Sequence, residues 1–180
     1  MATLQDRAAP HADRVKAASA LASSKDPSAS DTLADALGTT DEKLTEAVLA
    51  SLRALKAAPV LERRLQSDLP EQTKVRAAVA LRHLKEPSSV APLAAALKDP
   101  GSAVRKEAAL ALAVIGPQAA ETELIAALAD PDGDVRYFAA DALGAVKTPR
   151  ARAAISARIE VEKNPTVQSA LGVAGAKQAR

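Results

Sequence analysis

Apolar residues recur along the chain at the spacing of one face of an α-helix. Over residues 103–116 they lie at Val104, Ala108, Ala111, Leu112 and Ile115, which are separated by four, three, one and three positions. This is the pattern of an amphipathic helix. The segments over residues 74–84 and 134–146 show the same pattern. We therefore predict a series of helices, each with one apolar stripe directed into a core.

The helical segments repeat with a period of about 31 residues. One leucine recurs in the first helix of each period, at Leu21, Leu52, Leu81, Leu112 and Leu143. The second helix carries a pair of apolar residues four positions apart, at Leu33 and Leu37, Leu61 and Leu65, Leu93 and Leu97, Leu124 and Leu128, and Ile155 and Ile159. Prolines separate these segments twice per period, where their missing N–H does no harm at a helix start or turn. Each period thus predicts two helices whose apolar faces pack together.

These residues resemble the HEAT repeats, and in particular the short type related to phycobilisome lyases. The sequence pattern of one repeat in that family begins with Asp-Pro, followed by two or three residues and Val-Arg. A run of small residues then ends in Ala-Leu-Gly and a turn that contains Gly or Asp-Pro. The segment DPGSAVRKEAALALAVIGPQAAETELIAALADP over residues 99–131 matches along its whole length. The resemblance covers about residues 11–180. It implies helix pairs stacked into a right-handed superhelix, with the second helices on the concave side.

The predicted fold class is all-α, a right-handed α-α superhelix of about five helix pairs plus a C-terminal half repeat. We expect a single repeat domain over residues 11–180 and an N-terminal segment over residues 1–10 that is ordered in part. The approximate repeats span residues 11–39, 40–70, 71–100, 101–131 and 132–165, and the half repeat spans residues 166–180.

Composition argues against several kinds of chemistry. The chain has no cysteine and two histidines, His11 and His83, which predicts no disulfide, no thiolate metal site and no cysteine nucleophile. No glycine-rich loop has nucleotide-binding spacing. The repeated His-Glu pairs required by deoxyhypusine hydroxylases, which are HEAT-like dimetal enzymes, are absent. We therefore predict a protein that is not an enzyme and has no cofactor.

A basic residue recurs at one position of three successive repeats, and acidic residues crowd the neighbouring turns. The basic set is Lys74, Arg105 and Arg136, and the acidic set is Asp99, Asp130 and Asp134. A guanidinium pairs with a carboxylate through two parallel hydrogen bonds. We interpret these residues as a structural ladder that links each repeat to the next. An anion-binding row is the alternative.

The candidate binding residues are Arg63, Lys98, Tyr137, Arg150, Arg152 and Arg158. Arg63 and Lys98 are isolated charges on second helices that otherwise carry small residues, a surface suited to an apolar helix or extended peptide. The last three belong, with Lys147, to a basic cluster near the C-terminus. Tyr137 and its neighbour Phe138 are the sole tyrosine and phenylalanine. Aromatic side chains are frequent at binding hot spots, although packing is the alternative role.

We predict a non-catalytic scaffold, adaptor or regulatory subunit that binds another protein. The net charge of +2 is too small to favour nucleic acid as the partner. No apolar run is long enough to span a membrane, and the N-terminus lacks the apolar core of a signal peptide, so we expect a cytoplasmic monomer. Two alternatives stay open. One is an accessory protein of covalent modification resembling phycobilin lyases, and the other is a phosphate or nucleic-acid binder using the basic C-terminal end.

Overall fold

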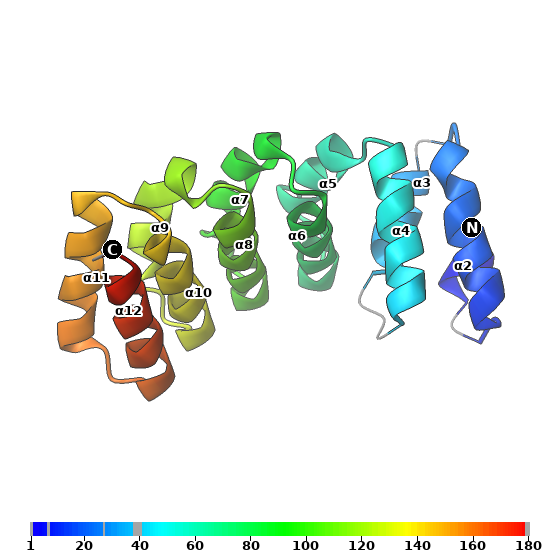
Figure 1. Ribbon diagram of the computed structural model, residues 1–180. Coiled ribbons are helices and arrows are strands. Elements are labelled where there is room, and N and C mark those ends of the chain that lie inside the picture. The colour runs from blue at the N-terminus through cyan, green and yellow to red at the C-terminus, as the bar shows by residue number, and fades with distance from the viewer. Residues whose placement is uncertain (1, 7, 27, 38–40, 179–180) are drawn as a thin grey trace. The chain divides into compact units, whose positions relative to one another are not determined.

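The computed structural model describes residues 2–6, 8–26, 28–37 and 41–178, and every regular element within these ranges is a helix (Figure 1). The chain divides into two compact units, Met1–Leu84 and Lys85–Arg180, which are described separately. The division falls between the two helices that the sequence pairs in the repeat over residues 71–100. The predicted all-α class of paired, stacked helices is confirmed, and its elements fit an α-α superhelix.

The N-terminal unit contains two helix pairs between a short first helix and a long last one. Its elements are α1 (Ala2–Gln5), α2 (His11–Ala20), η1 (Leu21–Ser23), α3 (Ala29–Asp35), α4 (Glu42–Ala54), α5 (Ala58–Leu65) and α6 (Glu71–Leu84). Helix α4 packs beside α2 and α6, and α3 packs beside α5. Helix α1 packs on α2 and α3 and buries Leu4 completely, so the first ten residues include an ordered element.

The C-terminal unit repeats this arrangement and ends in one long helix. Its elements are η2 (Pro87–Ser89), α7 (Val90–Ala96), α8 (Ser102–Ile115), η3 (Pro117–Ala120), α9 (Glu121–Ala127), α10 (Gly133–Gly144), α11 (Pro149–Val161) and α12 (Pro165–Gln178). Helices α8, α10 and α12 form one row, and α7, α9 and α11 form the other (Figure 1).

The recurring leucines form the core of each unit. All five first-helix leucines are buried, and so are the five residues from Leu33 to Ile155 that open the second-helix pairs. Alanine fills the space between helices, and small side chains let the backbones approach closely. At Gly144 a Cβ atom would stand 3.2 Å from the Cα of Ala174, so glycine permits the contact between α10 and α12.

Ile159 departs from the predicted inward stripe. The matching residues Leu37, Leu65, Leu97 and Leu128 are at most 6% exposed, but Ile159 is 39% exposed. Helix α11 is followed by α12, which has no second helix after it in the described part of the chain. Among these residues, no further second helix therefore packs on the far side of α11. The side chain therefore has the pattern of a core residue without the neighbour that would bury it.

Polar caps fix where several helices begin. The side chain of Asp41 accepts a hydrogen bond from the Leu44 amide at 3.0 Å, and Thr148 accepts one from the Ala151 amide at 3.0 Å. Asn164 caps α12 in the same way. Such caps satisfy amides that have no partner within the helix. These capping residues therefore stabilise the first turns of α4, α11 and α12.

Candidate functional site

Arg105 ties the repeat that contains α8 to the start of the next repeat. Its Nε and Nη2 atoms donate to both carboxylate oxygens of Asp130, at 2.7 and 2.9 Å. Its Nη1 atom donates to the carbonyl oxygens of Asp99 and Pro100, both at 3.0 Å. The Asp130 contact raises the pKa of Arg105 further. The guanidinium is therefore a structural link between α8 and the turns on either side of it.

Arg136 makes the same set of bonds one repeat later, but with a glutamate. It donates to the two carboxylate oxygens of Glu162 at 2.8 and 3.0 Å, and to the carbonyl oxygens of Asp130 and Pro131. Arg158 donates to the same carboxylate at 2.7 Å. These bonds, led by the one from Arg136, lower the pKa of Glu162 to about 2. The buried carboxylate is therefore ionised at every physiological pH.

Three further residues belong to the predicted ladder: Lys74, Asp99 and Asp134. Lys74 is buried on α6 at the position that precedes Arg105 by one period. The Asp99 carboxylate accepts from the Gly101 amide at 2.9 Å. Asp134 does not meet a ladder arginine, because its exposed carboxylate lies 3.6 Å from Lys106. We call each arginine with its carboxylate a rung of the ladder. Glu162 is the carboxylate of the Arg136 rung. Its position could have been predicted from the sequence, because Asp130 follows Arg105 at nearly the same spacing.

A second charge network joins three helices of the N-terminal unit. Arg64 on α5 lies 3.3 Å from the Asp31 carboxylate and 2.8 Å from that of Asp35, both on α3. It also donates to the Asp31 carbonyl at 3.0 Å. Arg76 on α6 lies 4.0 Å from Asp35. The sequence reasoning did not single out Arg64, because it stands beside Arg63 and carries no repeat signal.

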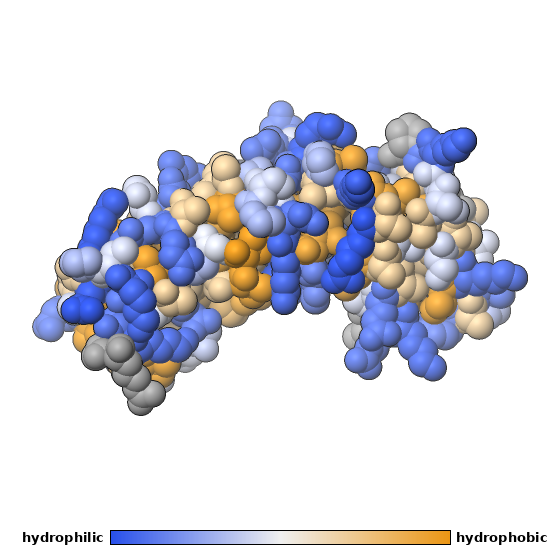
Figure 2. Space-filling model, turned by 45° about the horizontal axis from the view of Figure 1, so that its top comes forward, coloured by the Kyte–Doolittle hydropathy of each residue, from blue (hydrophilic) through white to orange (hydrophobic). Residues whose placement is uncertain are grey.

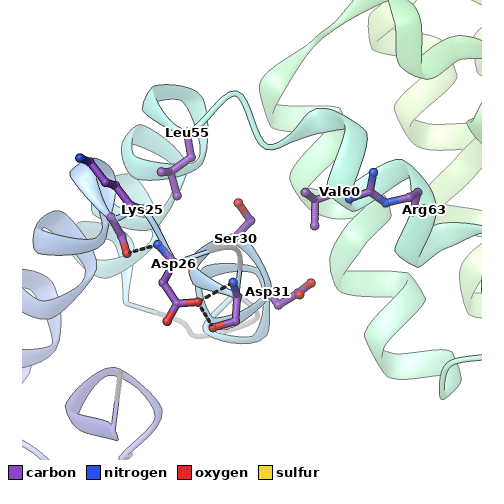
Figure 3. A pocket seen from close by; sticks show the side chains of 9 residues that line it. Lys25, Asp26, Ser30, Asp31, Leu55, Val60 and Arg63 are labelled. Carbon is purple, nitrogen blue, oxygen red and sulfur yellow. Dashed lines mark hydrogen bonds between the residues drawn. The ribbon is translucent and has the colours of Figure 1, made fainter.

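A solvent-open hollow of about 570 Å³ lies beside this network (Figure 3). It is lined by the loop before α3, the first turn of α3, the end of α4 and the exposed side of α5. The lining residues are Ser24, Lys25, Asp26, Ser28, Ser30, Asp31, Leu55, Val60 and Arg63. The volume lies in the range of sites that bind ligands. Of the predicted binding residues, the structure places Arg63 here.

Ser30 is the unusual polar group of this hollow. It is 7% exposed, yet its hydroxyl makes no hydrogen bond with any described residue. In Figure 3 the hydroxyl is directed into the space framed by Leu55 and Val60. The residue is mostly buried, but its hydroxyl oxygen is not among the buried polar atoms that lack a partner, so solvent reaches it from the hollow. The hollow therefore contains a donor that a bound molecule or water can satisfy.

The other polar residues of the hollow differ in whether their side chains have a partner within the protein. Asp26 accepts from both the amide and the hydroxyl of Ser28, at 2.9 and 2.8 Å. Asp31 is paired with Arg64. By contrast, the exposed side chains of Lys25 and Arg63 make no hydrogen bond or ion pair with a described residue. Lys25 and Arg63 are thus cations without an ion pair in the described part of the chain, and the Asp26 carboxylate is hydrogen-bonded but likewise has no ion pair there.

The other predicted binding residues do not form one cluster in the C-terminal unit. Lys98 is exposed at the end of α7, and Tyr137 packs edge-on against Phe138 with ring centroids 5.1 Å apart. The three arginines of α11 bond to neighbours within the unit. Arg150 donates to the Thr122 hydroxyl, Arg152 to the Gln178 carbonyl, and Arg158 to Glu162. On the face shown in Figure 2, hydrophilic side chains are spread over both units with apolar surface between them.

Two searches of the described part of the chain bear on other kinds of site. No group of three or more His, Cys, Asp or Glu residues there is placed to hold a metal ion. No helix in the same ranges has both the length and the apolar character needed to cross a bilayer.

Several solved structures are similar to this chain in fold. Human deoxyhypusine hydroxylase in complex with glycerol is 23% identical, with a TM-score of 0.59, covering 99% of this chain and 72% of that chain. An engineered protein is 23% identical, with a TM-score of 0.53, covering 96% of this chain and 93% of that chain. A designed armadillo repeat protein in complex with the peptide (KR)4 is 16% identical, with a TM-score of 0.55, covering 98% and 97%. At these identities the likeness shows the fold alone.

Among curated protein sequences, none matches the chain significantly. The profile of the HEAT repeats matches residues 58–120 and 91–174, which together make up more than half of the sequence. These matches run through the recurring leucines and both arginine rungs. The chain therefore belongs to the HEAT-repeat family.

Proposed function

We propose that this protein is a non-catalytic protein-binding module that acts as an adaptor or regulatory subunit. The observation that carries the proposal is the hollow on the N-terminal unit. It combines apolar side chains, Leu55 and Val60, with a hydroxyl that bonds to no described residue and an exposed guanidinium. An apolar pocket with a few polar groups that fix orientation is the usual form of a recognition site.

The state of the arginines favours a protein partner over a phosphate or nucleic-acid partner. Arg105 and Arg136 of the possible anion-binding row, and Arg158 of the basic C-terminal cluster, are neutralised by carboxylates within the fold. Binding to a nucleic-acid backbone depends on cations that exchange counter-ions with phosphates. Cations already paired within the protein contribute little to that exchange.

The role of the repeats in this proposal is to hold the binding groups rigidly. Val60 and Arg63 lie on α5, whose neighbour Arg64 is fixed to α3 by two ion pairs. Side chains on a helix that is held in place lose less conformational freedom on binding than side chains on a mobile loop. A designed armadillo repeat protein of similar fold is in complex with a peptide, which agrees with the proposal at the level of architecture.

The test uses a single cysteine for site-specific crosslinking. The sequence contains no cysteine, so Gln66→Cys places a unique thiol one helical turn after Arg63. A benzophenone attached there is irradiated in lysate of the source cells. We expect one dominant crosslinked protein, which an excess of unlabelled chain removes. The matched control is Lys43→Cys, an exposed site on the first turn of α4 and about 18 Å along that helix from Leu55.

Capture of the same proteins from both positions, or of none from Gln66→Cys, would contradict the proposal. A partner recovered from Gln66→Cys alone would place the contact at the hollow.

A further inference from the structure

The hollow on the N-terminal unit has one apolar side and one cationic end. Val60 and Arg63 are three residues apart on α5, so their side chains lie on the same face, about 5–6 Å apart at Cβ. Leu55 adds apolar surface from the end of α4, and the Ser30 hydroxyl is directed between Leu55 and Val60 (Figure 3). An occupant must therefore offer an aliphatic group next to an acceptor.

The charges around the hollow favour an anion at its α5 end. The carboxylate of Asp31 is neutralised by Arg64, and that of Asp26 is held by two bonds from Ser28. Arg63 and Lys25 have no ion pair with a described residue. A guanidinium with no internal partner binds a carboxylate through two parallel hydrogen bonds. Since Asp26 repels an anion at the loop side, Arg63 is the preferred contact.

We propose that the hollow binds an extended segment of a partner protein with an aliphatic residue and, two positions away, a glutamate or aspartate. This inference rests on the proposed function and names the chemistry of the partner. In an extended chain, residues i and i+2 point to the same side and stand about 6.5–7 Å apart. That spacing is about 1 Å longer than the Cβ separation of Val60 and Arg63 on α5, a difference that the long, exposed Arg63 side chain can span. The aliphatic side chain then covers Val60 and Leu55, the carboxylate meets Arg63, and the Ser30 hydroxyl donates to a peptide carbonyl.

The apolar side of the hollow separates this partner from a phosphate group or a nucleic acid. Neither of those offers an aliphatic group to cover Leu55 and Val60, and the Asp26 carboxylate, which has no ion pair with a described residue, would repel a densely charged chain. A peptide with a single carboxylate places its charge at Arg63 and leaves the rest of the hollow to neutral groups.

The test measures binding of the capped peptide Ac-Gly-Leu-Gly-Glu-Gly-NH2 to the full chain labelled with ¹⁵N. Its leucine and glutamate have the proposed spacing, and the same peptide with glutamine in place of glutamate is the control. We expect saturable amide shifts around Ser30, Val60 and Arg63. The glutamine peptide should bind about tenfold more weakly, the size expected for losing a hydrogen-bonded charge pair. Equal affinity for the two peptides, or shifts confined to other regions, would overturn the inference.

Variants assign the contacts. Arg63→Gln should weaken the glutamate peptide about tenfold and leave the glutamine peptide unchanged, which is the signature of direct coupling between the two groups. Lys43→Gln removes another exposed cation and should change neither affinity. Ser30→Ala should weaken both peptides a few-fold. Unchanged binding of the glutamate peptide to Arg63→Gln, or of both peptides to Ser30→Ala, would refute the corresponding contact.

This experiment fails separately from the crosslinking test. If the two peptides do not bind but Gln66→Cys still captures a partner, the protein-binding function survives and the acidic, aliphatic segment is wrong. If the capture fails as well, both proposals fall.

Discussion

Replacing Glu162 with glutamine would remove the charge of one rung and keep its shape. The carboxylate is 5% exposed and accepts hydrogen bonds from Arg136, Arg158 and the backbone amides of Lys163 and Asn164. A glutamine side chain has one oxygen and one NH₂ group, and the NH₂ donates rather than accepts. At least one of the two guanidinium groups would therefore face another donor. Water could not easily replace the lost acceptor, because the Arg136 side chain is 12% exposed.

Two lines of reasoning give the size of the effect. The pKa of Glu162 is lowered from 4.5 to about 2, mainly by the Arg136 contact. A difference of this size between the folded and unfolded protein corresponds to about 3 kcal/mol at neutral pH. Breaking a buried ion pair by removing one partner costs about 3–5 kcal/mol. We therefore expect Glu162→Gln to lower the free energy of unfolding by about 3 kcal/mol at pH 7.

Urea unfolding followed by far-UV circular dichroism measures this loss as a lower midpoint at a constant slope. The matched control is Asp134→Asn, which neutralises an acidic side chain that is 70% exposed and lies 3.6 Å from Lys106. An exposed pair of this kind contributes about 0.5 kcal/mol or less. A loss below about 1 kcal/mol for Glu162→Gln, with the slope unchanged, would refute the idea that the rung stabilises the fold.

Three further outcomes follow from the same structure. In urea titrations, the free energy of unfolding of wild type should exceed that of Glu162→Gln by about 3 kcal/mol at pH 7 and by about 1 kcal/mol at pH 3. The reason is that the pKa of Glu162 is lower in the folded than in the unfolded protein. Its ionised form therefore stabilises the fold fully above the unfolded pKa, and less as the pH falls toward the folded pKa. Leu128→Ala should cost about 2–5 kcal/mol, and Ile159→Ala under about 1 kcal/mol because that side chain is already exposed; equal losses would show that the two positions are equally packed. Gly172→Ala should raise the thermal midpoint, gaining up to about 1 kcal/mol of helix propensity with open space around its Cβ. Gly144→Ala should gain nothing, because its Cβ meets the backbone of α12.

The fold could be predicted well from the sequence because every repeat buries apolar residues at the same positions. Leu81, Leu112 and Leu143 mark one core position three times, so chance apolar residues are averaged out. Ile159 shows the limit of this inference. Its place in the series is correct, but burial depends on a neighbouring helix, which a residue pattern does not contain.

The candidate site was harder to predict because its residues come from positions that do not repeat. Arg63 was found as an isolated charge on a second helix, but Ser30 gave no signal, since serines are common in that loop. What distinguishes Ser30 is a mostly buried residue whose hydroxyl bonds to no described residue, and this is a property of packing. Glu162 was missed for another reason. The expectation was an aspartate before a proline, and the chain uses a longer acid with Lys163 and Asn164 inserted before Pro165.

The two arginine rungs also determine which changes of chain length this protein tolerates. Arg105 and Arg136 bond to two carbonyls in the turn before their own helix and to a carboxylate 25 or 26 positions later. Deleting residues 105–135 would join Val104 to Arg136, which would then have the carbonyls of Asp99 and Pro100 before it and Glu162 after it. A deletion between one of these arginines and its carboxylate that is not a whole period would separate the two groups. Loss or gain of whole periods is therefore the form of length variation that this architecture favours in descendants of the gene.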